Sequence, residues 1–147
     1  MKTLNQNSTE IFCQLIERMQ GKDHLRIENI PFMALSIEKL THGVKLGDLN
    51  EGTIYSLAHY YTSNGDLMSD PEMRFTVATD ENSLHSSQNL KIIPCSFEQS
   101  DLGMYEESII FGDQQHTEYN ADLQAEHVEF AEVWLNNIRD QKYLDQL

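Results

Sequence analysis

Apolar residues follow a helical spacing at both ends of this 147-residue chain and alternate with polar residues in between. The first helical stretch stops before Gly21, a residue that commonly ends helices, and Asn120 is a suitable N-cap for the second. The apolar positions are Leu4, Ile11, Phe12, Leu15, Ile16 and Met19 in the first stretch, and Leu123, His127, Phe130, Ala131, Trp134, Leu135 and Ile138 in the second. This pattern predicts a helix at each end and a sheet between them.

The central part of the chain is rich in β-branched and aromatic residues and is interrupted by turn-forming residues. The candidate strands cover residues 24–30, 32–40, 53–62, 73–79, 90–97 and 105–111. Residues 63–72 and 80–89 are polar and predict loops, and Pro94 places its strand at an edge or a bulge. We therefore predict one α+β domain over residues 1–147. Its antiparallel sheet has about five or six strands and is flanked by an N-terminal and a C-terminal helix.

The chain is strongly acidic, with 24 aspartates and glutamates, 10 lysines and arginines, and a formal net charge of −14. This charge argues against direct binding to nucleic acids or anionic lipids, because both need a basic surface. Cys13 and Cys95 are the only cysteines and form no CxxC motif, which is typical of reduced proteins. The sequence shows no export signal and no apolar run long enough to span a membrane, so we expect a cytoplasmic protein.

A dense polar segment between residues 59 and 73 contains the first candidate site. Asn64-Gly65 predicts a turn, because both residues tolerate a positive φ. Asp66, Asp70 and Glu72 crowd the predicted loop, and His59 ends the strand before it. Such side chains suit a hard cation or acid–base chemistry, although the ligand spacing of an EF-hand is missing. Three interpretations stay open: carboxylates that accept hydrogen bonds within a turn, a metal site, and a loop that binds a partner.

The same segment carries a resemblance to a known family. Its motif reads His59-Tyr60-Tyr61, then Asn64-Gly65-Asp66-Leu67-Met68, then Asp70-Pro71-Glu72-Met73. It resembles the signature of a family of small acidic bacterial proteins found on plasmids, integrative elements and phages. The segment from Phe130 to Gln141 is similar to the terminal helix of that family. The resemblance implies an accessory role on a mobile element, and it carries over no catalytic residues.

The C-terminal helix contains the second candidate site. Asp122, Glu126, Glu129 and Glu132 lie on one face of it, opposite the apolar residues. Successive charges lie about 4.5–6 Å apart along the axis, which is comparable to the phosphate spacing of about 3.4 Å per strand of DNA. An acidic face of this kind can occupy a cationic channel that normally holds nucleic acid. The alternative is a solvated face that keeps the protein soluble. Further carboxylates that could serve the same role are Asp101, Glu106, Glu107 and Asp113.

These observations favour a non-enzymatic interaction protein with no cofactor and no metal. We expect its partner to be a host nucleic-acid-binding protein with a basic groove. The expected role is the inhibition of a host defence system, such as a CRISPR effector or a restriction enzyme. Two alternatives remain: a small metal-dependent enzyme that uses His59, Asp66, Asp70 and Glu72, and an accessory protein of plasmid maintenance. The six histidines show no HxH, HxxxH or HExxH spacing, which argues against a zinc site.

Overall fold

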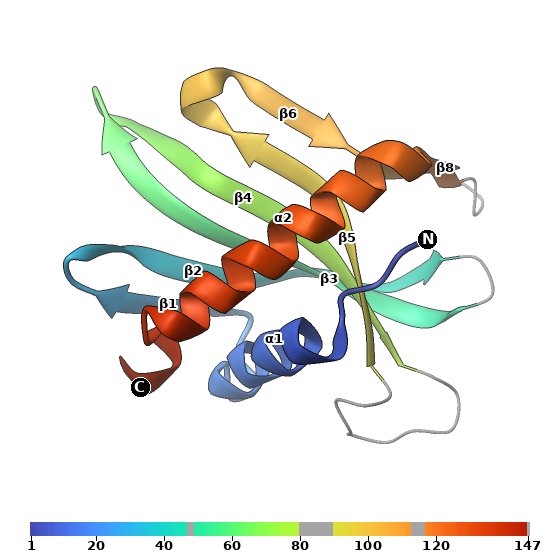
Figure 1. Cartoon of the computed structure of the whole chain (residues 1–147), viewed down its shortest axis with the longest axis horizontal. Coiled ribbons are helices and arrows are strands. Elements are labelled where there is room, and N and C mark those ends of the chain that lie inside the picture. Colours follow the sequence, from blue (N-terminus) through green and yellow to red (C-terminus); the bar gives the residue numbers. More distant parts are fainter. Residues whose placement is uncertain (47–48, 80–89, 113–116, 147) are drawn as a thin grey trace.

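Figure 1 shows the computed structural model of the chain, which describes residues 1–46, 49–79, 90–112 and 117–146. A six-stranded antiparallel sheet has the strand order β1-β2-β3-β4-β5-β6, and two helices lie on one of its faces. The helices and main strands are α1 (Gln6–Arg18), β1 (His24–Asn29), β2 (Phe32–Leu46), β3 (Leu49–Ser63), β4 (Asp66–Thr79), β5 (Leu90–Gln99), β6 (Met104–Glu107) and α2 (Ala121–Asp140). This arrangement confirms the predicted α+β class. None of the described helices is long and apolar enough to cross a membrane.

Short elements complete the chain. A two-stranded ladder is formed by β7 (Ile109–Phe111) and β8 (Thr117–Tyr119). Two single-turn 3₁₀ helices, η2 (Ser100–Leu102) and η4 (Tyr143–Gln146), follow β5 and α2. The strand predicted over residues 105–111 is therefore two strands, because the buried Ser108 interrupts it. The predicted loop at residues 80–89 lies outside the described residues, as does Asp113.

One hydrophobic core lies between the helices and the sheet. Every second residue of the central strands faces the helices, as the alternation in the sequence predicts. The fully buried members of this core include Phe12 and Leu15 of α1, Leu35, Ile37, Leu57, Met73, Phe75 and Ile92 of the sheet, and Ala131, Leu135 and Ile138 of α2. Because α1 and α2 share this core, both helices are held against the same face of the sheet.

The β3–β4 connection differs from the prediction. Residues 63–72 do not form a loop, because the strands are joined by a two-residue turn at Asn64 (φ 51°) and Gly65 (φ 83°), and Ser63 pairs with Asp66. Residues 66–72 are part of β4, with a register shift between Ala58 and Tyr60 that accommodates Asp70-Pro71 as a bulge. The polar composition suggested a loop, but a bulge keeps such residues in a strand. Pro94 lies at a second bulge, opposite Phe75, as predicted.

The turn yields a stability prediction. Gly65→Val should lower the free energy of unfolding by about 1–3 kcal/mol, since a β-branched residue at positive φ is strained. No atom lies within 4 Å of a Cβ added at Gly65, so steric clashes would not contribute. Urea denaturation measures the change, and Leu67→Val at an exposed position of β4 is the control. An unchanged midpoint would show that Gly65 does not hold this geometry in solution.

Candidate functional site

His59 of the first candidate site lies in the core. It is 8% exposed, and its Nδ1 lies 3.1 Å from the backbone oxygen of Ala34, to which it donates. Its Nε2 accepts a hydrogen bond from the indole N–H of Trp134 on α2, also at 3.1 Å. Burial lowers the pKa of His59, although the Ala34 carbonyl and Asp70 act in the opposite direction. Both ring nitrogens are therefore committed to neighbours, and neither is free to bind a metal or to transfer a proton.

The three carboxylates of that site do not converge with His59. Glu72 pairs with Ala58 across the strands and points to the uncovered face of the sheet, where it accepts a hydrogen bond from the Tyr60 hydroxyl at 2.5 Å. Asp70 accepts from the side-chain amide of Gln99, and Asp66 is exposed beside the turn. Within the described residues, no group of three or more histidines, cysteines, aspartates and glutamates is arranged to hold a metal ion. The structure thus separates the four residues of the metal-enzyme alternative.

The uncovered face of the sheet carries a carboxylate pair. Glu98 on β5 lies opposite Glu72 on β4. Burial, followed by a hydrogen bond to Glu72 and the charge of Glu72, raises the pKa of Glu98, whereas the nearby Arg74 lowers it. A hollow of about 240 Å³ lies close by and is lined by Arg74, Tyr105 and Glu107, among others. Tyr105 and Glu107 are hydrogen-bonded to each other at 2.5 Å. Four polar side chains of this face therefore form two pairs, Glu72 with Glu98 and Tyr105 with Glu107.

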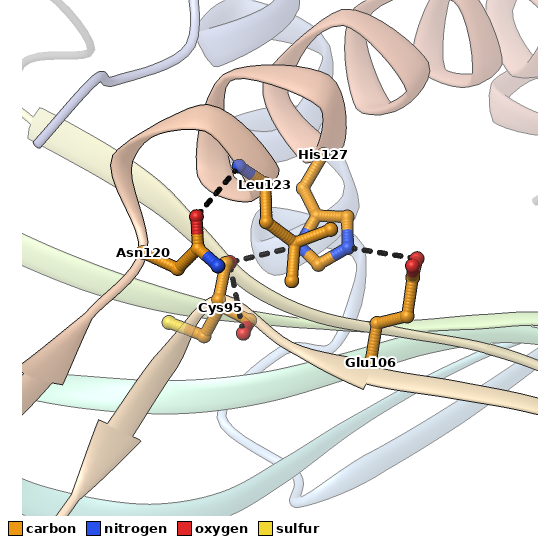
Figure 2. A network of polar contacts seen from close by, with 6 residues as sticks. Cys95, Glu106, Asn120, Leu123 and His127 are labelled. Atoms are coloured by element: carbon orange, nitrogen blue, oxygen red, sulfur yellow. Dashed lines mark hydrogen bonds and ion pairs between the residues drawn. The ribbon is translucent and has the colours of Figure 1, made fainter.

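A second histidine, His127, belongs to a buried polar network under the first turns of α2 (Figure 2). Its Nε2 lies 3.4 Å from a carboxylate oxygen of Glu106, and its Nδ1 lies 2.8 Å from the hydroxyl of Ser108. A carboxylate only accepts, so the neutral ring carries its proton on Nε2. The Ser108 hydroxyl then donates either to Nδ1 or to the backbone oxygen of Cys95, which lies 3.1 Å away.

The residue types of this network are those of a catalytic triad, but its geometry is that of a structural link. Ser108 is 1% exposed and His127 is 3% exposed, so a substrate has no access to the hydroxyl. The network ties the end of β6 to α2, and Asn120 caps the same helix by accepting from the backbone N–H of Leu123 at 3.1 Å (Figure 2). The predictions that His127 lies on the apolar face of this helix and that Asn120 is its N-cap are confirmed.

The two buried histidines predict a pH dependence of stability. Burial lowers the pKa of His59 and of His127 below 6.5, so the unfolded chain binds more protons than the folded one as the pH falls through this value. The free energy of unfolding should fall between pH 7.5 and 5.5, with a slope of at most about 1.4 kcal/mol per pH unit for each histidine.

Urea titrations at several pH values measure this slope. His127→Gln should reduce it, and His24→Gln at the exposed end of β1 serves as the control. A stability that rises towards pH 5.5 would mean that Glu106 holds the imidazolium of His127 in the folded state.

The four carboxylates of the second candidate site do not share one free face. Asp122, Glu126 and Glu129 are exposed on the solvent side of α2. Glu132 lies at the edge of this polar face nearest to α1, where its carboxylate accepts a hydrogen bond from the backbone N–H of Asn5 at 2.6 Å. This contact anchors the residue that caps α1. Sequence periodicity placed all four on one polar face, but only tertiary contacts showed that α1 covers part of it.

The exposed side of α2 also contains two apolar side chains. Phe130 is 40% exposed, although its spacing placed it on the apolar face of the helix, and Val133 is 62% exposed. Phe130 rests against Phe97 of β5 with ring centroids 4.9 Å apart and is only partly covered by it. At about 100° per residue, Val133 falls between Glu126 and Glu129 on the helical wheel. The sequence already contained this signal, because the apolar Val133 among acidic residues indicates that the face is not only acidic. We call Asp122, Glu126, Glu129, Phe130 and Val133 the α2 flank.

The remaining acidic candidates that the structure describes have partners within the fold. Asp101 accepts from Gln99 at 2.9 Å, Glu107 accepts from Tyr105, and Glu106 contacts His127. Among the described residues, no lysine or arginine lies within 4 Å of Asp122, Glu126 or Glu129. Among the described residues, the α2 flank therefore carries three exposed carboxylates on one helix without a cation within 4 Å.

Comparisons with known proteins place the chain in a family. No curated protein and no solved structure matches it. The family model described as "Domain of unknown function (DUF6908)" matches residues 10–144, a range that starts within α1 and ends in η4. The chain therefore belongs to the DUF6908 family.

Proposed function

We propose that this protein is an acidic, non-enzymatic interaction protein that occupies a basic surface of a nucleic-acid-binding protein. The observation that carries the proposal is the α2 flank, where three exposed carboxylates on one helix have no cationic neighbour within 4 Å among the described residues. Such a helix offers negative charges at fixed positions, and a basic groove gains the same electrostatic steering from them as from phosphates.

The proposal also names the kind of system that the protein inhibits and the compartment in which it acts. From residue 75 to residue 138 the sequence contains one cation, Lys91, so a basic groove would meet little repulsion there. The resemblance of the segment around Asn64-Gly65 to mobile-element proteins supports inhibition of a host defence system, such as a CRISPR effector or a restriction enzyme. The free, buried thiols of Cys13 and Cys95 fit a cytoplasmic setting.

A capture experiment tests this function. The protein is immobilised and exposed to a lysate of its host, and captured proteins are identified and then eluted with double-stranded DNA. We expect nucleic-acid-binding proteins that DNA displaces, since DNA and the α2 flank would compete for one basic surface.

A charge-neutral variant shows whether the flank is responsible. Asp122→Asn combined with Glu126→Gln and Glu129→Gln should weaken the affinity for the captured partner by about 10–150-fold, at about 0.5–1 kcal/mol per charge. The dependence of the affinity on salt should weaken as well. Glu132→Gln is the matched control, because Glu132 faces α1 and the amide oxygen of glutamine can still accept from Asn5. Equal partner affinity and an equal salt slope in the triple variant would refute the proposal.

A further inference from the structure

An apolar strip continues from the α2 flank onto the sheet. Phe97 and Glu106 are paired across β5 and β6, and so are Gln99 and Met104, so all four side chains share the face on which α2 lies. Met104 is 39% exposed. In Figure 1 the β5–β6 hairpin extends beyond α2 on the side away from α1, which leaves this part of the sheet without a covering helix. We call Phe97, Met104, Phe130 and Val133 the apolar strip.

The strip is more than scattered exposed residues. Phe130 and Val133 are three positions apart on α2 and are therefore neighbours on its surface. Phe130 contacts Phe97 with ring centroids 4.9 Å apart, and Phe130 also lies 6.2 Å from Trp134, which is buried beneath it. The rings are thus held in place by a packed aromatic base. Contiguous apolar surface on a rigid base is typical of a protein interface.

Carboxylates lie next to the strip on both α2 and β6. Glu126 and Glu129 lie along α2, and Glu106 lies on β6, two residues from Met104. The side chain of Glu106 is 36% exposed, and its contact with His127 directs it towards α2. A surface that binds through charge alone does not require exposed phenylalanine, methionine and valine side chains between its carboxylates. The complementary partner must combine apolar side chains with flanking cations.

We infer that this surface docks a cationic amphipathic helix of the partner protein. This inference rests on the proposed function. A helix presents apolar side chains at i, i+3, i+4 and i+7 along one stripe, and lysine or arginine on both edges of that stripe reaches outward. The stripe contacts Phe97, Met104, Phe130 and Val133, and the cations meet Glu106 on β6 and Glu126 and Glu129 on α2. The basic surface of the partner protein, as proposed above, is then the cationic side of this helix.

A defined peptide tests the docking directly. The probe is a blocked peptide of leucine and lysine, about 14 residues or roughly four helical turns long, with its leucines at helical spacing. A second peptide of identical composition alternates leucine and lysine, which favours a strand that could add to the sheet edge at β6. Binding to the full chain is measured by calorimetry, and the contact site by amide chemical shifts.

We expect the helical peptide to bind at least about tenfold more tightly than the alternating one, with shift changes confined to α2, β5 and β6. Val133→Ser should weaken binding by about 3–10-fold, equivalent to about 0.7–1.4 kcal/mol, and Met104→Ser should act similarly. Leu67→Ser is the matched control, because Leu67 is 69% exposed on β4 outside the strip. All three variants change exposed side chains, so the fold is retained.

The possible results are distinguishable from failure of the proposed function. If Val133→Ser and Met104→Ser bind the helical peptide as the original chain does, and salt alone abolishes binding, the docking inference is wrong while the charge-based function stands. Preferential binding of the alternating peptide would replace helix docking by strand addition at β6. If captured partners bind the triple charge-neutral variant described above with the affinity and the salt slope of the original chain, the proposed function fails, whatever the peptide result.

Discussion

Replacing Trp134 by alanine should lower the free energy of unfolding by about 3–5 kcal/mol, the range for large aromatic side chains in a core. Trp134 is 6% exposed, and its ring packs against His59 at 5.5 Å and Phe130 at 6.2 Å between centroids. Its indole N–H is also the donor to Nε2 of His59, so the substitution leaves a buried acceptor without a partner. Urea denaturation monitored by circular dichroism measures the loss.

A second variant separates packing from hydrogen bonding. Trp134→Phe keeps an aromatic ring but removes the donor, and should cost about 1–3 kcal/mol. Val133→Ser, one residue away but exposed, should change stability by less than about 0.5 kcal/mol. If Trp134→Phe were as stable as the original chain, the contact with His59 would contribute no net stability, and His59 would become available for another role.

Replacing Phe12 by alanine should also cost about 3–5 kcal/mol. Phe12 is fully buried and attaches α1 to the sheet through Phe75, with ring centroids 4.8 Å apart, and Tyr55, at 6.2 Å. Thermal and urea unfolding measure the effect. Gln14→Ala on the exposed side of the same helix is the control and should change stability by less than about 0.5 kcal/mol.

This variant has a further consequence for the α2 flank. Because α1 holds α2 through Glu132 and Asn5, loosening α1 exposes the covered side of α2 rather than the α2 flank. A Phe12→Ala protein that remains folded at low temperature should therefore bind the leucine–lysine peptide as before. Stability equal to that of the original chain would mean that α1 is not anchored by this ring.

Local patterns identified both helices and the six strands of the sheet, but several strand boundaries were wrong and β8 was not predicted. Helical spacing identified α1 and α2, and Asn120 was recognised as an N-cap because its side chain bonds only three residues away. The stretch from Asp66 to Glu72 was misassigned to a loop, because its composition is that of a turn. A bulge opposite His59 keeps this stretch in β4. Because a bulge depends on the pairing with the neighbouring strand, local composition does not predict it.

The candidate sites also combine features that the local sequence predicts with features that depend on tertiary contacts. The sequence by itself determined the α+β class, the net charge and the presence of carboxylates along α2, since these depend on composition and on contacts between near neighbours. Only the tertiary structure decided which of these groups are free. Glu132 is used by a residue 127 positions away, and His59 by a tryptophan 75 positions away. Whether a side chain is exposed or paired depends on segments that are distant in sequence and brought together by packing. The periodicity within one helix or strand therefore does not predict this exposure or pairing.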